Sequence, residues 1–203
     1  MKARVVTVQI QPDKLDEAVS IFRDSVVPAA TKYDGCHALF LVTDRSSGKG
    51  VSISIWDEPE LQSSESGGFL QEQFAKFAGV FAAPPVRELY DLGIWERASQ
   101  TPSHVRLLTS QVKPGQADAA IDRLHSLLPE LRQQAGFLGL LALTDAITGK
   151  VITASAWMSD AEMLASQASG GNLERNLASV AEFLSAPPVR ENYAVAARWV
   201  RQS

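Results

Sequence analysis

The first half of the chain begins with two hydrophobic patterns of different period. Apolar and polar residues alternate over residues 4–11, which predicts a β-strand. Over residues 13–32 the apolar positions recur at helical spacing, which predicts an amphipathic helix with Asp13 as a candidate N-cap. Pro28 lies inside this helix, and Pro129 lies at the matching place in the second half. We expect both helices to kink or to begin a new segment at the proline.

Two β-rich runs, residues 37–43 and 51–56, follow this helix. The polar, glycine-containing connection DRSSGKG joins them, which is typical of a β-hairpin. A second helical region is interrupted by Gly67 and Gly68, and a last strand is predicted over residues 86–95. The predicted order of elements is therefore β-α-β-β-α-β, the ferredoxin-like arrangement.

The second half of the chain repeats the first at an offset that drifts between 101 and 103 residues. The hexapeptide APPVRE occurs in both halves, at residues 83–88 and 186–191. Further matches, in order along the chain, are ARVVTVQIQP with VRLLTSQVKP, TDRSSGK with TDAITGK, Trp56 with Trp157, and SGG at Ser66 with SGG at Ser169. A full-length repeat indicates two copies of one fold. We predict an α+β protein with two ferredoxin-like domains in tandem, residues 1–98 and 102–203.

Composition places the protein among ordinary globular chains and excludes several classes of partner. Of its 203 residues, 45% are hydrophobic and 21% are charged, so no disordered or fibrous class is indicated. The net charge is -4, and the basic residues form no stripe, so we expect no nucleic-acid partner. No apolar run is long enough for a membrane helix, and no signal peptide is apparent, so a cytoplasmic location is expected. Cys36 is the single cysteine and is interpreted as a small core residue.

The predicted third strand of each half has one uniformly apolar face, and a second face with small polar side chains beside a tryptophan. Small side chains next to one large aromatic leave room for a ligand. We expect that ligand to enter between the sheet and the helices of a half, because the branched apolar face should close-pack. The alternative is that these are packing residues between two layers. The candidate ligand-binding residues are Ser52, Ser54 and Trp56 with Thr7 and Gln9, and Thr153, Ser155 and Trp157 with Thr109 and Gln111.

The repeated APPVRE segment has two interpretations. Its prolines end a helix and release the chain into the last strand, which is a purely structural role. Arg87 and Arg190 instead offer a planar fork of donors that could hold an anionic group. His37, His104 and His125 show no metal-ligand spacing, so we expect no metal site.

Together these features resemble the antibiotic biosynthesis monooxygenase-like family of the dimeric α+β barrel superfamily. The resemblance rests on the tandem halves, the TD..TGK hairpin, the proline-rich start of the last strand, and a third strand ending in tryptophan, followed by WDEPELQSSES or WMSDAEMLASQ. It implies that the sheets of two ferredoxin-like units come together as a barrel. Here the two units would form an internal pseudo-dimer within one chain, and a higher oligomer is left open.

The resemblance also limits the activities to be considered. Enzymes of the family oxidise aromatic, polyketide-like compounds without metal or flavin, or degrade haem, and the third-strand tryptophan belongs to those sites. This role carries over to Trp56 and Trp157 alone. Haem-degrading members place a histidine on the following helix, where this sequence has Ser66 and Gln167, so haem would lack its axial ligand. The pocket asparagine of several family enzymes is unmatched, and we expect no cofactor.

Three functions of different classes follow from these observations. The first is a cofactor-independent monooxygenase that acts on small aromatic or polyketide-like compounds. The second is a non-catalytic protein that binds a small hydrophobic or aromatic molecule in the same clefts. The third is a structural or assembly domain without a ligand. The lack of a base in the predicted pocket favours the second over the first, because proton abstraction needs a group of suitable pKa within hydrogen-bond reach.

Overall fold

The computed structural model describes residues 1–98, 100–168 and 171–202. Its internal contacts divide the chain into two compact units. Unit 1 contains Met1–Tyr90 and Val195–Ser203, and unit 2 contains Asp91–Ala194. The domain boundary predicted between residues 98 and 102 stays a prediction. Ser99 at that boundary, and Ser169 and Gly170 of the second SGG motif, lie outside the described residues.

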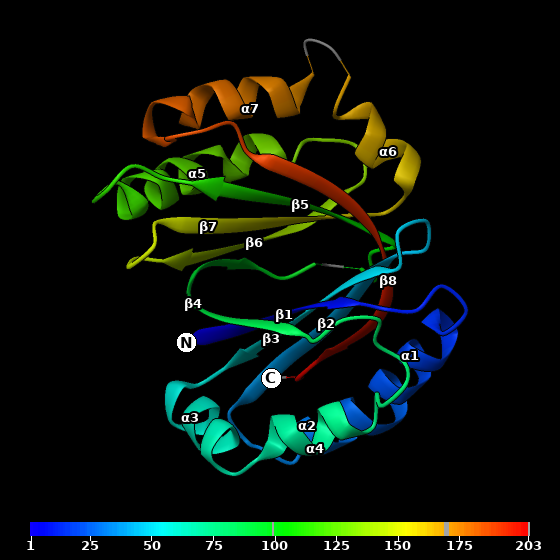
Figure 1. Ribbon diagram of the computed structural model, residues 1–203. Helices are drawn as coiled ribbons and strands as arrows, with labels where there is room; N and C mark the ends of the chain where they lie inside the picture. Colours follow the sequence, from blue (N-terminus) through cyan, green and yellow to red (C-terminus); the bar gives the residue numbers. More distant parts are fainter. Residues whose placement is uncertain (99, 169–170, 203) are drawn as a thin grey trace. The chain divides into compact units, whose positions relative to one another are not determined.

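Both units contain the predicted elements in the same order (Figure 1). Those that begin in unit 1 are β1 (Lys2–Gln9), α1 (Leu15–Ile21), a π-helical turn (Phe22–Val26), α2 (Val27–Ala30), β2 (Cys36–Asp44), β3 (Lys49–Trp56), α3 (Glu58–Ser66), α4 (Phe69–Ala75) and β4 (Val86–Glu96). Those that begin in unit 2 are β5 (His104–Gln111), α5 (Ala117–Leu131), β6 (Phe137–Asp145), β7 (Lys150–Trp157), α6 (Asp160–Ala165), α7 (Asn172–Val180), a 3₁₀ turn (Ala181–Phe183) and β8 (Val189–Val200). The predicted ferredoxin-like α+β fold is confirmed.

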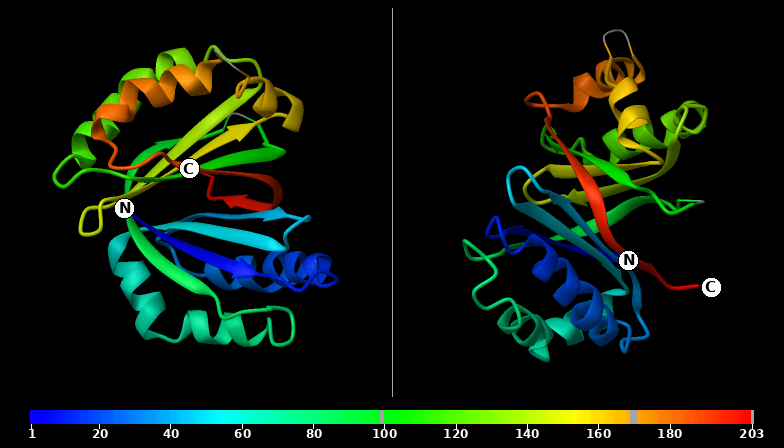
Figure 2. Two further views of the ribbon diagram at one scale, coloured as in Figure 1. Left: turned by 45° about the horizontal axis from the view of Figure 1, so that its top comes forward. Right: turned by 90° about the vertical axis from the view of Figure 1, so that its right-hand side faces the viewer.

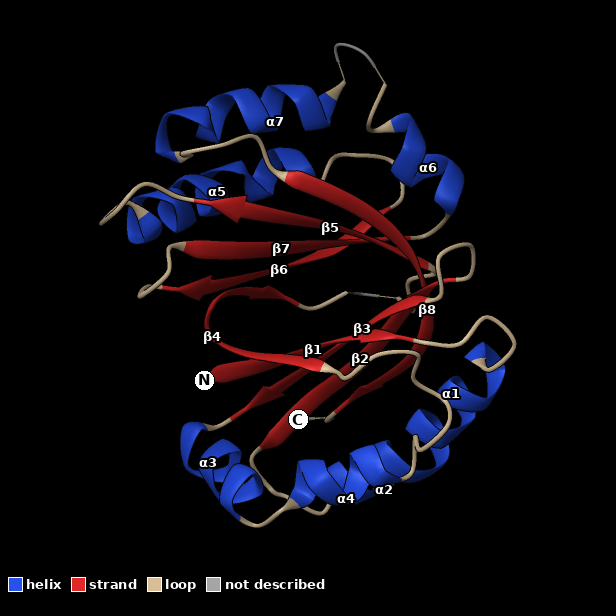
Figure 3. Ribbon diagram, viewed as in Figure 1, coloured by secondary structure: helices blue, strands red, loops and turns tan. Residues whose placement is uncertain are grey.

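The sheets of both units are antiparallel, and each is centred on its third strand. In unit 1, β3 pairs with β1 and β2, and in unit 2, β7 pairs with β5 and β6. The helices of each unit cover one face of its own sheet (Figures 2 and 3). Strands β4 and β8 each continue from one unit into the other, because Asp91–Glu96 pair with β6 while Val195–Val200 belong to unit 1.

The first helix of unit 1 differs from the prediction at its start and at its proline. Asp13 does not cap it, because Asp13 lies inside a turn closed by the hydrogen bond from Lys14 N to Gln11 O, and the helix begins at Leu15. A π-helical turn then precedes Pro28, which occupies the first turn of α2, where its missing N–H leaves no bond unmade. In unit 2, α5 continues through Pro129 without such a break.

The hairpin between the second and third strands is built in the same way in both units. Asp44 accepts hydrogen bonds from Ser46 and Ser47, and these bonds lower the pKa of its carboxyl group. Asp145 does the same with Thr148. Gly48 follows with a φ of 71°, and a Cβ at this position would lie 2.6 Å from the carbonyl oxygen of Ile10. The TD..GK pattern therefore encodes an acceptor that closes the turn and a glycine that the turn requires.

The core of unit 1 lies between its helices and its sheet. Leu15, Ala18 and Phe22 pack with β-strand residues such as Val6 and Leu39, and all five side chains are buried. The opposite sheet face is buried as well, since Val5, Ile53 and Ile55 are at most 3% exposed. Among the described residues, no helix is long and apolar enough to cross a membrane.

Cys36 should resist alkylation in the folded protein. Its side chain is fully buried, and burial raises the pKa of the thiol to about 12, so the reactive thiolate is almost absent at neutral pH. We expect no incorporation of iodoacetamide into the native protein by intact-mass spectrometry, and one adduct after denaturation. Ser46→Cys, at an exposed hairpin position, provides the control that must react while folded. Fast labelling of native Cys36 would contradict its placement in the core.

Candidate functional site

Unit 1 contains a cavity between its sheet and its helices, on the side predicted from the sequence. It encloses about 650 Å³ of empty space, part of it open to solvent. Its walls are mainly aliphatic and aromatic, and four polar side chains interrupt them: Arg4, Ser52, Ser54 and Gln73. Such a combination of apolar walls and few polar groups is typical of sites for small molecules.

Trp56 forms part of this cavity and is held by other aromatic rings. Its side chain is fully buried and makes edge-to-face contacts with Tyr33 and Phe69, at centroid distances of 5.8 and 6.2 Å. The guanidinium carbon of Arg4 lies 5.3 Å from the centroid of the indole, which is within cation–π range. The indole Nε1 is buried and has no hydrogen-bond partner among the described residues.

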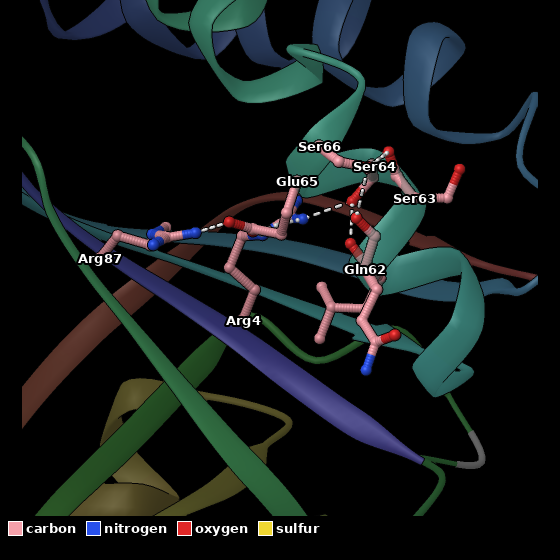
Figure 4. Close-up of polar contacts among 8 residues, drawn as sticks. Arg4, Gln62, Ser63, Ser64, Glu65, Ser66 and Arg87 are labelled. Atoms are coloured by element: carbon pink, nitrogen blue, oxygen red, sulfur yellow. Dashed lines mark hydrogen bonds and ion pairs between the residues drawn. The ribbon is translucent and has the colours of Figure 1, made fainter.

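Among the described residues, Arg4 is the one charged residue that lines the unit 1 cavity, and its charge is balanced within the protein. Its Nε donates to Glu65 Oε1 at 2.8 Å, and its Nη2 donates to Ser64 Oγ at 2.5 Å. Glu65 Oε2 forms an ion pair with Arg87, so one carboxylate lies between two guanidinium groups (Figure 4). Burial, and then the charge of Arg87, lower the pKa of Arg4 to about 10, which leaves it charged at neutral pH.

Unit 2 contains a cavity at the equivalent place, with about 740 Å³ of empty space that is also partly open. Leucine, valine and alanine side chains from the sheet and from α5 and α7 form most of its wall. The polar residues that line it are Arg106, Ser110, Thr153, Ser155 and Asn176. Neither cavity has an aspartate, glutamate or histidine among its described lining residues.

Arg106 corresponds to Arg4 but has weaker partners. Only 4% of its surface is exposed, and its Nη1 donates to Ser166 Oγ at 2.8 Å and to the carbonyl oxygen of Met163 at 3.4 Å. Its Nε is buried without a partner among the described residues, as is Oδ1 of Asn176. Burial, and then the charge of Arg190, lower the pKa of Arg106 to about 10. Two residues that line the unit 2 cavity therefore each have a buried polar atom, one donor and one acceptor, without a hydrogen bond among the described residues.

The structure brings five of the ten predicted site residues to the cavities. Ser52, Ser54 and Trp56 line the first cavity, and Thr153 and Ser155 line the second. Trp157 is buried beside the second cavity's wall residues but does not line the cavity itself. Its Nε1 donates to Ser155 Oγ at 3.0 Å, and Arg106 lies 5.0 Å from its ring centroid.

The predicted residues from the first strand lie outside both cavities. Antiparallel partners share a sheet face, and Arg4 is paired with Ser54, so the residues of β1 that face the cavity are Arg4, Val6 and Val8. Thr7 and Gln9 occupy the alternate positions, and Gln9 donates to Ser47 O in the hairpin. In unit 2, Thr109 and Gln111 stand at the same alternate positions, and Gln111 donates to Thr148 O.

The sequence interpretation missed the two arginines of the first strands. A signal for them exists: Arg4 and Arg106 are the charged residues inside otherwise apolar strands, and they match in the repeat. A charge at the same strand position in both halves is expected to be buried and paired rather than merely solvated.

The two positions that a haem histidine would occupy are engaged in local bonds. Ser66 donates to the carbonyl oxygen of Gln62, and Gln167 donates to Asn192 Oδ1 at 3.3 Å. Nε2 of His37 lies 2.9 Å from Oδ2 of Asp57. Within the described part of the chain, no cluster of histidine, cysteine, aspartate and glutamate could hold a metal ion.

Comparison with known proteins agrees with this architecture. Residues 103–173 match the family model described as Antibiotic biosynthesis monooxygenase. An uncharacterized protein of Mycobacterium tuberculosis is 29% identical over 163 residues, which cover 75% of this chain and 69% of that protein. A second uncharacterized protein of the same organism is 31% identical over 150 residues, which cover 70% of this chain and 61% of its own length.

Solved structures show the same fold over almost the whole chain. A putative monooxygenase from Lactobacillus acidophilus superimposes with a TM-score of 0.75 at 8% identity, covering 98% of this chain and 95% of that one. An anthrone oxidase-like protein superimposes with a TM-score of 0.72 at 15% identity, covering 98% and 92%. The predicted resemblance to the antibiotic biosynthesis monooxygenase family is thereby confirmed.

Replacing Glu65 by glutamine should destabilise the protein. The change leaves the buried Arg4 without its counter-charge, and removing one partner of a buried ion pair typically destabilises a protein by about 3–5 kcal/mol. Because the Glu65 side chain keeps 23% exposure, we expect a smaller loss of about 2 kcal/mol in the free energy of unfolding, measured by urea denaturation. Asp24→Asn breaks an exposed pair with Arg23 and should change nothing measurable. Equal effects of both variants would contradict this account.

Proposed function

From the premise that residues 103–173 form an antibiotic biosynthesis monooxygenase domain, we propose that the protein binds a small aromatic or polyketide-like molecule in the cavity of unit 2. The observation that supports this most is the pair of unsatisfied polar atoms among apolar walls, Arg106 Nε and Asn176 Oδ1. Buried polar groups in folded proteins normally have partners, and a ligand oxygen is a suitable one for each.

The apolar wall determines the general shape of this ligand. Residues of α5 and α7, such as Leu124 and Leu177, face strand residues such as Leu108 and Leu140. A flat or extended hydrocarbon body placed between these layers would remove apolar surface from water, which is favourable by about 25 cal/mol per Å². The ligand's oxygen atoms would be directed toward Arg106 and Asn176, because each of these lining residues has a buried polar atom without a hydrogen bond among the described residues.

The charge of Arg106 determines whether the ligand oxygen beside it must accept or donate a hydrogen bond. Its pKa of about 10 leaves the guanidinium positive at neutral pH, and it has donors but no acceptor. A ligand oxygen beside Nε must therefore be an acceptor, such as a carbonyl, a phenolate or an enolate. The Oδ1 atom of Asn176 requires the reverse, so a second group that donates, such as a hydroxyl, fits there.

Oxidation of the bound molecule by O₂ is a second candidate, favoured by the family match and by the names of the structural neighbours. In such a reaction an activated methylene becomes a carbonyl, with one oxygen atom in the product and the other released as water. Arg106 would stabilise the enolate formed when the substrate loses its proton. No carboxylate or imidazole lines either cavity in the described residues, and we therefore place binding before catalysis.

Filling the unit 2 cavity should abolish binding. Leu124 lines the cavity and is half-buried, so Leu124→Trp would direct an indole into the ligand volume. We expect its affinity for naphthols and anthrones, followed by tryptophan fluorescence, to fall at least tenfold. Leu164→Trp on α6 is the matched control, since Leu164 is 47% exposed and does not line the cavity. Unchanged affinity in Leu124→Trp would remove this cavity as the binding site.

Binding should proceed without consumption of O₂. With anthrone as the compound, we expect the uptake measured by an oxygen electrode to equal that of the Leu124→Trp variant, because the cavity offers no base to remove the substrate's proton. Uptake by the native protein that matches product formation, and that is lost in Leu124→Trp, would establish the oxidation instead.

A further inference from the structure

The two units share an arrangement of two arginines at the edge of their cavities but differ at one residue beside them. In unit 1, Glu65 lies between Arg4 and Arg87 (Figure 4). Ser64 and Ser166 correspond, because each accepts a hydrogen bond from the first-strand arginine of its unit and donates to the carbonyl oxygen three residues earlier. The counterpart of Glu65 is therefore Gln167. Unit 2 therefore keeps the arginines and has no carboxylate at this position.

The unit 2 arginines lie on one face of the sheet. Arg190 of β8 is paired with Leu108 of β5, and Leu108 lines the cavity together with Arg106. Cross-strand partners and alternate residues share a face, so the Arg190 side chain extends from the cavity side of the sheet. Arg190 is exposed and has no ion pair or hydrogen bond among the described residues. Its positive charge lowers the pKa of Arg106, as the charge of Arg87 lowers the pKa of Arg4.

The charge balance of the two arrangements differs by one unit. Two guanidinium groups and one carboxylate give +1 in unit 1, whereas Arg106 and Arg190 give +2 in unit 2, where the neutral Gln167 stands in place of Glu65. Two positive charges repel each other more strongly where water is partly excluded. A buried guanidinium also loses its hydration, and a neutral hydroxyl compensates for that loss less well than a carboxylate does. The Nε that Arg4 directs to Glu65 is, in Arg106, the atom without a partner.

We propose that the ligand of unit 2 is a hydrophobic carboxylic acid whose carboxylate supplies to Arg106 and Arg190 the negative charge that Glu65 supplies to Arg4 and Arg87 in unit 1. The inference rests on the proposed function, because it uses the same cavity. Unit 1 itself is the template, since it shows which anion fits two arginines in this setting. A carboxylate accepts from guanidinium Nε and Nη donors in a bidentate manner, and the acid's hydrocarbon part then lies between α5, α7 and the sheet.

This assignment makes the two cavities unequal. Glu65 and Ser64 already satisfy Arg4, so an acid entering unit 1 would have to displace an internal carboxylate. No such competitor faces Arg106 among the described residues. One acid per chain is therefore expected, bound in unit 2.

The test compares acids with their neutral amides and changes one charge at a time. We would titrate the protein calorimetrically with 2-naphthoate, 4-phenylbutyrate and decanoate, and with the primary amide of each. We expect one site per chain for at least one acid, and at least tenfold weaker binding of its amide. Gln167→Glu would supply the internal carboxylate, and we expect it to bind the acid at least tenfold more weakly than the native protein, in which Gln167 has the same size without the charge.

A reciprocal change tests the comparison of the units. Glu65→Gln should open the unit 1 cavity to the acid and raise the stoichiometry from one to two per chain, in protein shown to be folded by circular dichroism. A folded Glu65→Gln variant with one site would contradict the equivalence on which the proposal rests. The Gln167→Glu measurement does not depend on that variant's stability.

The outcomes separate this inference from the proposed function. Equal affinity for acid and amide, or equal affinity of Gln167→Glu and the native protein for the acid, with binding still lost in Leu124→Trp, would overturn the carboxylate site and leave the cavity as the binding site. Failure of every acid, amide, naphthol and anthrone to bind the native protein would overturn both.

Discussion

Each unit contains one arginine side chain that is buried away from water. Both cavities depend on how that buried charge is stabilised. A guanidinium is stable in an apolar surrounding only if acceptors and ring faces replace its hydration. In unit 1 Glu65, Ser64 and Trp56 surround Arg4, and the same need fixes the position of α3 relative to β1. In unit 2 the indole of Trp157 remains but the carboxylate does not, so Arg106 is stabilised less completely.

The sequence predicted the elements well because their patterns are local. The alternation in β1 and β3, the hairpin aspartates and glycines, and the break at Gly67 all result from contacts within a few residues. The start of α1 was misplaced because Asp13 has the chemistry of a cap but is held in the preceding turn. A sequence shows that an aspartate side chain is able to cap a helix. It does not show which of two competing local hydrogen-bonding patterns the segment adopts.

The candidate site was only half predictable, for a reason that can be seen in β1. Val5 and Val6 point to opposite faces and are 2% and 6% exposed, so hydrophobicity alone does not distinguish the cavity face from the other. The pairing of Arg4 with Ser54 decides it, and register is a property of two strands rather than one. In the third strand, Ser52, Ser54 and Trp56 alternate on one face, and that face lines the unit 1 cavity.

The course of β4 and β8 has a consequence for the way the protein denatures. Each strand is one continuous segment that belongs to one unit at its start and to the other at its end. Unfolding of either unit therefore disrupts strands that the other unit also contains, so the two units are not expected to unfold independently. A fragment ending near Ala98 would lack Val195–Val200, a segment of its own sheet, so the smallest piece expected to melt as a native structure is the entire polypeptide.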